Sequence, residues 1–157
     1  MSRAEIETLS REIINPIGPW LINYKVCGSY RRGKPDSGDI DIVYLPYEDK
    51  TGVVDIELEH LYGCKATHVK KSFMYNGVQV EMLPANFKDW GAMILYATGP
   101  GEFNVEMRRK AKSLGYKLNQ YGLFEFKNGE YAYVVGRSEE EIFIMLQMPW
   151  LLPEERK

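Results

Sequence analysis

The N-terminal stretch carries apolar side chains at helical spacing. Positions i, i+3, i+7 and i+8 place four of them on one side of a helix over residues 3–15, which Pro16 ends. These four residues are Ile6, Leu9, Ile13 and Ile14. We therefore predict an amphipathic helix that packs one face against a core.

Strand-like segments dominate the next part of the chain. Runs rich in β-branched and aromatic residues, bounded by turn residues, occupy 24–27, 40–45, 66–75 and 78–83. Asn76-Gly77 joins the last two and is a strong signal for a tight hairpin. Residues 53–61 fit either a strand or a helix, because acidic residues alternate within a helix-compatible composition, and we favour a helix. The pattern predicts a mainly antiparallel sheet in this half of the chain.

The turn cluster Thr-Gly-Pro-Gly at 98–101 marks a change in composition. We expect it to separate a first domain, 1–97, from a second domain, 98–157. A helix should follow the cluster and end near Gly115, since its apolar residues share one stripe. They are Phe103, Met107, Ala111 and Leu114.

The remaining residues predict a hairpin and a helix. Segments 118–126 and 131–135 flank Asn128-Gly129, and Ser138 with Glu141 forms a capping box for the last helix. That helix carries Ile142, Phe143 and Leu146. Runs of antiparallel strands with flanking helices, rather than alternating β-α-β units, indicate an α+β fold.

Composition and charge narrow the class of protein. With 157 residues, of which 45% are hydrophobic, the chain can bury a core, and no apolar run approaches the roughly 20 residues of a membrane span. The start lacks a signal-peptide pattern, so we expect a soluble, intracellular protein with no membrane partner. Cys27 and Cys64 lack the spacing of a zinc site or a disulfide framework and should be free thiols.

The net charge of -2 means that nucleic-acid binding would need a local basic patch. A charge run alone is more often a solvated face. Two groups qualify as candidates: Lys65, Lys70 and Lys71, and Arg108, Arg109, Lys110, Lys112 and Lys117.

One segment combines features of a metal site with features of a phosphate site. Asp39 and Asp41 lie two apart on a predicted strand, so both carboxylates should emerge on one face, where they could share hard cations. Such spacing alone is common. Upstream, the Gly28-Ser29 turn and the nearby arginines offer backbone N–H groups, a hydroxyl and a guanidinium to phosphate oxygens. Together these features indicate a nucleotide and metal site.

These residues resemble the family X DNA polymerases, whose palm carries Gly-Ser, an arginine three residues after that serine, and Gly-Asp-x-Asp. The matching residues here are Gly28, Ser29, Arg32, Gly38, Asp39 and Asp41. The resemblance continues through Tyr96-Ala97-Thr98-Gly99, which is similar to the family's Tyr-Phe-Thr-Gly hinge, and through Phe103-Asn104 with Arg108. Residues 118–124 look like the minimal viral members, and 138–153 resemble the family's last helix and tail. The likeness covers residues 20–155.

The resemblance implies a nucleotidyltransferase palm with a mixed, mainly antiparallel sheet, followed by a small C-terminal α+β lobe that selects the nucleotide. It also implies two Mg²⁺ ions, for which Mn²⁺ could substitute, held by Asp39, Asp41 and a third carboxylate. Counting back from the hinge places this third group at Glu81, where the family usually has Asp. The alternatives Asp55, Glu57 and Glu59 are more simply a solvated face.

Further roles follow from the same resemblance. The nucleotide would be held by Gly28, Ser29, Arg32, Gly38, Tyr96, Gly99 and Asn104. DNA would be contacted by Arg108, Lys112 and Tyr121. Donors such as Asn104 and Arg108 suit the minor groove, whose acceptors occupy similar places in every correct base pair.

The resulting hypothesis is a monomeric, template-directed DNA polymerase. It would add dNTPs to a primer 3′-hydroxyl on primer-template or gapped DNA and fill short gaps in repair. Residues before 20 leave no room for a lyase domain, so abasic-site lyase activity is not expected. Two alternatives stay open: a nucleotidyltransferase with a non-DNA acceptor, and a nucleotide- or DNA-binding protein without turnover.

Overall fold

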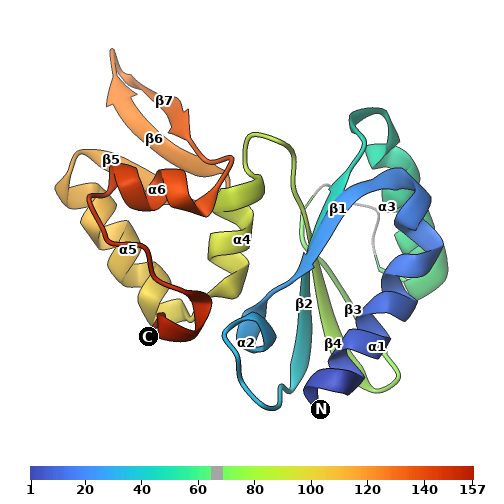
Figure 1. Cartoon of the computed structure of the whole chain (residues 1–157). Helices are drawn as coiled ribbons and strands as arrows, with labels where there is room; N and C mark the ends of the chain where they lie inside the picture. Colours follow the sequence, from blue (N-terminus) through green and yellow to red (C-terminus); the bar gives the residue numbers. More distant parts are fainter. Residues whose placement is uncertain (65–68) are drawn as a thin grey trace. The chain divides into compact units, whose positions relative to one another are not determined.

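The structure, a computed structural model, describes residues 1–64 and 69–157 (Figure 1). The chain folds as two units, Met1–Asn86 and Phe87–Lys157, each with its own hydrophobic core. Helix α4 (Trp90–Thr98) therefore belongs to the second unit, whereas the division expected at residue 97 assigned it to the first. Its buried residues Ala92 and Leu95 explain the difference, because they lie in the core of the second unit.

The first unit is built on a mixed sheet with strand order β1-β2-β4-β3. The strands are β1 (Leu21–Val26), β2 (Asp39–Pro46), β3 (Lys71–Tyr75) and β4 (Val78–Pro84). β1 runs antiparallel to β2 and β3 antiparallel to β4, while the central β2 and β4 are parallel. The expected Asn76-Gly77 hairpin is confirmed, and both turn residues have positive φ, as a two-residue hairpin turn of this type requires.

Helices α1 (Arg3–Ile14) and α3 (Thr51–Tyr62) contribute to the core of this unit. Ile6 of α1 and Leu58 of α3 are fully buried in one cluster with Ile40 and Ile42 of β2. The helix expected at 53–61 is thus confirmed. Short helices join these elements: η1 (Asn15–Trp20), α2 (Gly28–Arg31) and η2 (Glu48–Lys50).

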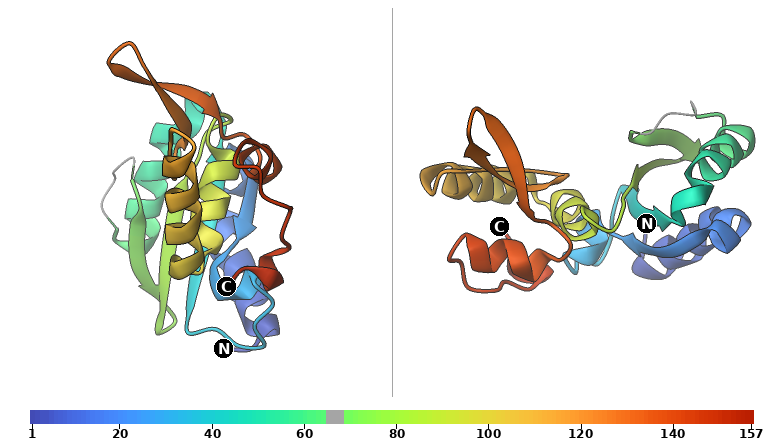
Figure 2. Two further views of the ribbon diagram at one scale, coloured as in Figure 1. Left: turned by 90° about the vertical axis from the view of Figure 1, so that its left-hand side faces the viewer. Right: turned by 90° about the horizontal axis from the view of Figure 1, so that it is seen from above.

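The second unit combines helices with a three-stranded antiparallel sheet. After α4 come α5 (Gly101–Ser113), β5 (Tyr116–Asn119), β6 (Gly122–Lys127), β7 (Glu130–Val135), α6 (Glu139–Met145) and η3 (Pro153–Glu155). The expected stripe of α5 is buried at Phe103, Met107 and Ala111, and the Ser138 hydroxyl caps α6 by accepting from the Glu141 N–H. The β6–β7 hairpin extends beyond α5 and α6 in all three views (Figures 1 and 2).

Two expectations for the strands need correction. The segment 118–126 is not one strand, because a turn at Gln120 and Tyr121 divides it into β5 and β6. The Asn119 side chain stabilises this turn by accepting from the Tyr121 N–H at 2.8 Å. The strand expected at 66–75 begins at Lys71, and residues 65–68 of that prediction lie outside the described residues.

The reading of Asp55 and Lys71 as surface charges is wrong. Lys71 Nζ lies 2.7 Å from Asp55 Oδ1, with both side chains almost fully buried between α3 and β3. Lys71 therefore neutralises a buried carboxylate and does not form a basic patch with Lys70. Lys65, the third member of that patch, falls outside the described residues.

The structure also bears on two other expectations. Cys27 and Cys64 are free and buried, as expected. Among the described residues, no helix combines the length and apolar character needed to span a bilayer.

Candidate active site

Three carboxylates lie on adjacent strands of the first sheet. Asp39 and Asp41 alternate along β2 with the buried Ile40 and Ile42, so both point away from the core face. In the parallel pairing of β2 with β4, Asp41 is opposite Glu81. Paired residues of neighbouring strands point to the same side, about 5 Å apart at the backbone. The sheet therefore presents Asp39, Asp41 and Glu81 on the face opposite its core.

The turn before α2 approaches this face closely. The Cys27 N–H donates to the Asp41 carbonyl at 2.7 Å, and Gly28 follows with φ +60. A Cβ atom on Gly28 would lie 2.3 Å from Asp41 Oδ2, which is closer than any side chain tolerates. Glycine is needed here for both its backbone conformation and its lack of a side chain.

Ser29 and Arg32 lie on α2 and at its C-terminal end, beside the carboxylates. The Ser29 hydroxyl donates to the Ser37 hydroxyl at 2.6 Å, and Ser37 is buried. The Arg32 N–H donates to the Gly28 carbonyl at 3.2 Å and closes the short helix. Gly38, directly before β2, has open space where a side chain would be.

Arg3 is a supporting residue that the sequence analysis missed. Its guanidinium lies 4.0 Å from the Tyr30 ring centroid and donates to the Tyr30 carbonyl at 2.7 Å and the Lys34 carbonyl at 3.0 Å. Helix α1 thus holds the C-terminal part of α2 and the start of the loop that leads to β2. No local motif marks this role, because the contacts span 27 and 31 residues of sequence.

Burial and the two neighbouring carboxylates both act on Asp41. Burial, followed by the charges of Asp39 and Glu81, raises the pKa of Asp41 to about 6, although Arg32 and Lys70 oppose the shift. Lys70 also forms an ion pair with Glu81, with Nζ and Oε1 3.2 Å apart. Lys70 therefore acts as a counter-ion at the edge of the carboxylate group.

The donor atoms suit a hard divalent cation. Carboxylate oxygens are the ligands that Mg²⁺ prefers, and a cation would offset the burial and the repulsion that raise the pKa of Asp41. The three side chains are nevertheless not gathered around one point. Within residues 1–64 and 69–157, no group of three or more Asp, Glu, His or Cys side chains is arranged to hold a metal ion. Glu81 instead forms its ion pair with Lys70.

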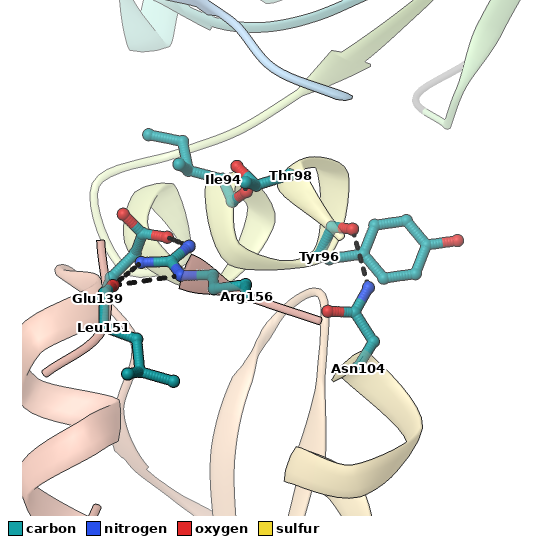
Figure 3. Close-up of polar contacts among 7 residues, drawn as sticks. All are labelled: Ile94, Tyr96, Thr98, Asn104, Glu139, Leu151 and Arg156. Atoms are coloured by element: carbon teal, nitrogen blue, oxygen red, sulfur yellow. Dashed lines mark hydrogen bonds and ion pairs between the residues drawn. The ribbon is translucent and has the colours of Figure 1, made fainter. Parts of the chain in front are cut away.

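The expected nucleotide- and DNA-contacting residues of the second unit gather on α4, α5 and the β5–β6 turn. Asn104 Nδ2 donates to the Tyr96 carbonyl at 2.9 Å (Figure 3). Both residues line a small pocket together with Met107, Arg108 and Asn119. The bond orients the Asn104 amide and leaves its second N–H available to another acceptor.

The remaining expected residues of this unit are exposed or define the bend between helices. Lys112 is exposed on α5, and Tyr121 is 47% exposed at the turn between β5 and β6. Gly99 follows α4 with φ 63 and ψ -150, a conformation that favours glycine. Within the α5 charge run, Arg109 pairs with Glu106, which lowers the net positive charge of that helix face.

Comparisons with known proteins match both units. A model of the DNA polymerase beta palm matches residues 1–89, and a model of the DNA polymerase beta thumb matches residues 93–157. DNA polymerase lambda of Rattus norvegicus is 24% identical over 98% of this chain, which spans only 32% of that protein. Repair DNA polymerase X of African swine fever virus is 26% identical over 85% of this chain and 81% of its own length.

Solved structures show the same likeness. The crystal structure of Leishmania infantum polymerase beta in a ternary P/T complex has a TM-score of 0.79 and is 29% identical, and the match covers all of this chain and 76% of that one. Its ternary gap complex has a TM-score of 0.81 and is 26% identical, with 70% of that chain covered. The α+β fold expected from the sequence is thereby confirmed.

Proposed function

The chain belongs to the DNA polymerase beta family, the family X DNA polymerases, and from that membership we propose that it is a template-directed DNA polymerase that fills short gaps in DNA repair. The observation that carries the proposal is the register of Asp41 with Glu81, beside Asp39 and the Gly28 turn. This register sets three carboxylates next to a candidate phosphate site. The substrates of the proposed polymerase are a dNTP and a primer-template or gapped DNA. We propose that the enzyme acts as a monomer on intracellular DNA.

Asp39, Asp41 and Glu81 would hold two Mg²⁺ ions, for which Mn²⁺ could substitute. Such ions, when bound, stabilise the attacking and leaving oxygens of an in-line displacement. Glu81 is one methylene longer than the aspartate usual in the family, and its side chain must leave Lys70 to take part. The strand register keeps the three backbone positions fixed while the Glu81 side chain turns.

The segment from Gly28 to Gly38 would bind the β- and γ-phosphates of the nucleotide. Ser29 offers a hydroxyl that Ser37 orients, Arg32 offers a guanidinium, and the two glycines let the phosphates approach the backbone. Binding here aligns the pyrophosphate leaving group with the primer hydroxyl. Positioning and charge stabilisation then supply most of the rate enhancement.

In the second unit, Asn104 and Arg108 would test the shape of the nascent base pair from its minor-groove side. Asn104 still has one free amide N–H after its bond to Tyr96, so it can donate to a purine N3 or pyrimidine O2. Tyr96 and Gly99 would lie at the sugar of the nucleotide. Lys112 and Tyr121 would contact the DNA.

A primer-extension assay tests this proposal. The full chain is given a one-nucleotide gapped substrate, Mg²⁺ and each dNTP separately, and primer length is followed on a denaturing gel. We expect extension only with the dNTP complementary to the template base. Asp41→Ala should abolish extension, whereas Asp49→Ala, which removes an exposed carboxylate elsewhere in the same unit, should not.

Absence of extension, with intact metal-dependent nucleotide binding, would show a binding protein without turnover. Extension that ignores the template base would contradict template direction and point to terminal-transferase activity. Transfer to RNA or a small molecule, but not to DNA, would identify a nucleotidyltransferase with another acceptor.

A further inference from the structure

The outer face of the β5-β6-β7 sheet carries aromatic and basic side chains. Strand pairing places Lys117 beside Phe124, Phe124 beside Tyr133, and Phe126 beside Tyr131. Leu118 and Leu123 point the opposite way, into the core with α5 and α6. These positions define an aromatic face that lies on the side of the sheet away from that core.

The rings of this face form two edge-to-face pairs. Phe124 and Tyr133 have centroids 6.0 Å apart, and Phe126 and Tyr131 have centroids 5.2 Å apart. The outer pair is strongly exposed, with 59% of Phe126 and 55% of Tyr131 open to solvent. Exposed apolar surface gathered at one place is typical of a binding site.

Charge is divided between the two faces of the hairpin. Lys117 Nζ lies 5.0 Å from the Tyr131 ring centroid, and Lys88 Nζ lies 5.7 Å from that of Tyr133. The strand positions of the aromatic face, all of them described, include no carboxylate. Glu125 and Glu130 lie on the other face, where Lys127 approaches Glu125 to 3.7 Å. On its strand positions, the aromatic face thus combines open rings with the Lys117 cation.

We propose that this aromatic face binds single-stranded nucleic acid, with bases stacked on Phe126 and Tyr131 and a phosphate held by Lys117. Exposed aromatic rings accept any base by stacking, and neighbouring lysines neutralise the backbone. Lys117 lies over the Tyr131 ring and would turn toward a phosphate when a strand binds. A purely apolar partner would desolvate the Lys117 ammonium without offering it a counter-charge, which favours an anionic strand.

The strand on this face is unpaired template, an identification that rests on the proposed polymerase function. β5 directly follows α5, whose exposed residues Arg108 and Lys112 are the proposed DNA contacts, and the two elements pack together. The surface would increase affinity for recessed or gapped DNA without reading its sequence.

Fluorescence anisotropy without metal or dNTP separates this proposal from catalysis. Three labelled DNAs are compared: a 12-nucleotide oligo(dT), a blunt hairpin duplex, and the same duplex with a 5′ overhang. Phe126→Ala and Tyr131→Ala should each weaken binding of the oligo and the overhang by at least about fivefold, and leave the blunt duplex unchanged. Tyr131→Phe should retain binding because it keeps the ring.

Lys127 provides a matched control for Lys117. Both are exposed lysines of one sheet, but they point to opposite faces. Lys117→Ala should weaken binding of the oligo and reduce the salt dependence, whereas Lys127→Ala should have little effect on either. Thermal melting should show that the variants remain folded, because all the substituted side chains are exposed.

Equal binding by the parent chain and by the Phe126→Ala, Tyr131→Ala double variant would overturn the proposal. So would equal effects of the two lysine substitutions. If the chain extends primers but shows either of these results, the proposed polymerase function stands and the proposed binding surface is wrong. If the aromatic substitutions weaken binding but the chain does not extend primers, the binding surface stands and the polymerase function is wrong.

Discussion

Burial perturbs the Asp41 carboxyl more than any neighbouring charge does. Its pKa is raised to about 6 from its ordinary value of 3.8, first by burial and then by Asp39 and Glu81. Between these two values the native protein binds a proton that the unfolded chain has released. This group therefore favours folding at acid pH, and its contribution is lost as pH rises toward and through 6.

Replacement of Asp41 by asparagine should stabilise the metal-free protein while abolishing extension. We expect the free energy of unfolding at pH 7.5 in EDTA to rise by about 1–2 kcal/mol, a value reduced for partial exposure. The gain should shrink to near zero below pH 4, where the aspartate is protonated in both states. Urea denaturation across pH 3.5–8 measures it. A gain that is independent of pH would contradict the electrostatic explanation.

Lys70 competes with a metal ion for Glu81, since its ammonium already lies 3.2 Å from the carboxylate. Lys70→Met should lower the dissociation constant for Mn²⁺ about two- to fivefold, because it frees Glu81 and removes a nearby positive charge. Isothermal titration with Mn²⁺ alone measures this, without any nucleotide. Lys70→Arg should restore parent behaviour, and Lys25→Met, an exposed lysine of β1, should change nothing. Weaker Mn²⁺ binding in Lys70→Met would refute competition.

Among the individual residues of the site, the common direction of Asp39 and Asp41 could be predicted from the sequence, because side chains alternate along a strand. The partners of the site could not be predicted in the same way. Lys70, Ser37 and Arg3 reach it through register and loop closure, which depend on contacts distant in sequence. Asp55 was misread because its ion pair with Lys71 forms only when α3 packs against β3.

Helix α4 could not be predicted from the spacing of apolar residues along the chain. Its residues Gly91, Ala92, Met93, Ile94 and Leu95 are all buried, so no polar stripe marks the helix in the sequence. The amphipathic α1 and α5 were predicted from their stripes, and the start of α6 from its capping box. The turn between β5 and β6 was missed although Asn119, whose side chain accepts from the Tyr121 N–H, and Gly122, with φ 144, flank it.

The junction of α4 with α6 depends on the absence of a side chain at Gly91. A Cβ there would lie 2.3 Å from the Ser138 backbone. Gly91→Ala should therefore lower the free energy of unfolding by about 3 kcal/mol or more, because backbone must move. Gly52→Ala is the matched control: Gly52 lies in helix α3 with open space around it, so alanine should be neutral or stabilise by up to about 1 kcal/mol. Chemical denaturation of both variants measures the contrast, and similar effects would contradict it.

In the part of the chain that the structure describes, each unit has a strongly buried ion pair that joins distant segments. In the first unit, Lys71 pairs with Asp55, and in the second, Arg156 pairs with Glu139 at 2.6 Å (Figure 3). The Arg156 guanidinium also donates to the Leu151 carbonyl and lies 5.3 Å from the Phe143 ring centroid and 5.1 Å from that of Trp150. It thereby ties the C-terminal segment to α6.

Loss of one member of such a pair leaves a buried charge without its main counter-ion. Arg156→Met should therefore destabilise the second unit by about 3 kcal/mol, and Lys71→Met the first by a similar amount. Because the cores are separate, hydrogen exchange followed by mass spectrometry should show faster exchange mainly in 87–157 for Arg156→Met and mainly in 1–86 for Lys71→Met. Lys157→Met, at an exposed neighbouring position, should leave both patterns unchanged. Equal loss of protection in both units from either variant would mean that the chain unfolds as one cooperative body, so that a charge buried in either core would limit the stability of both.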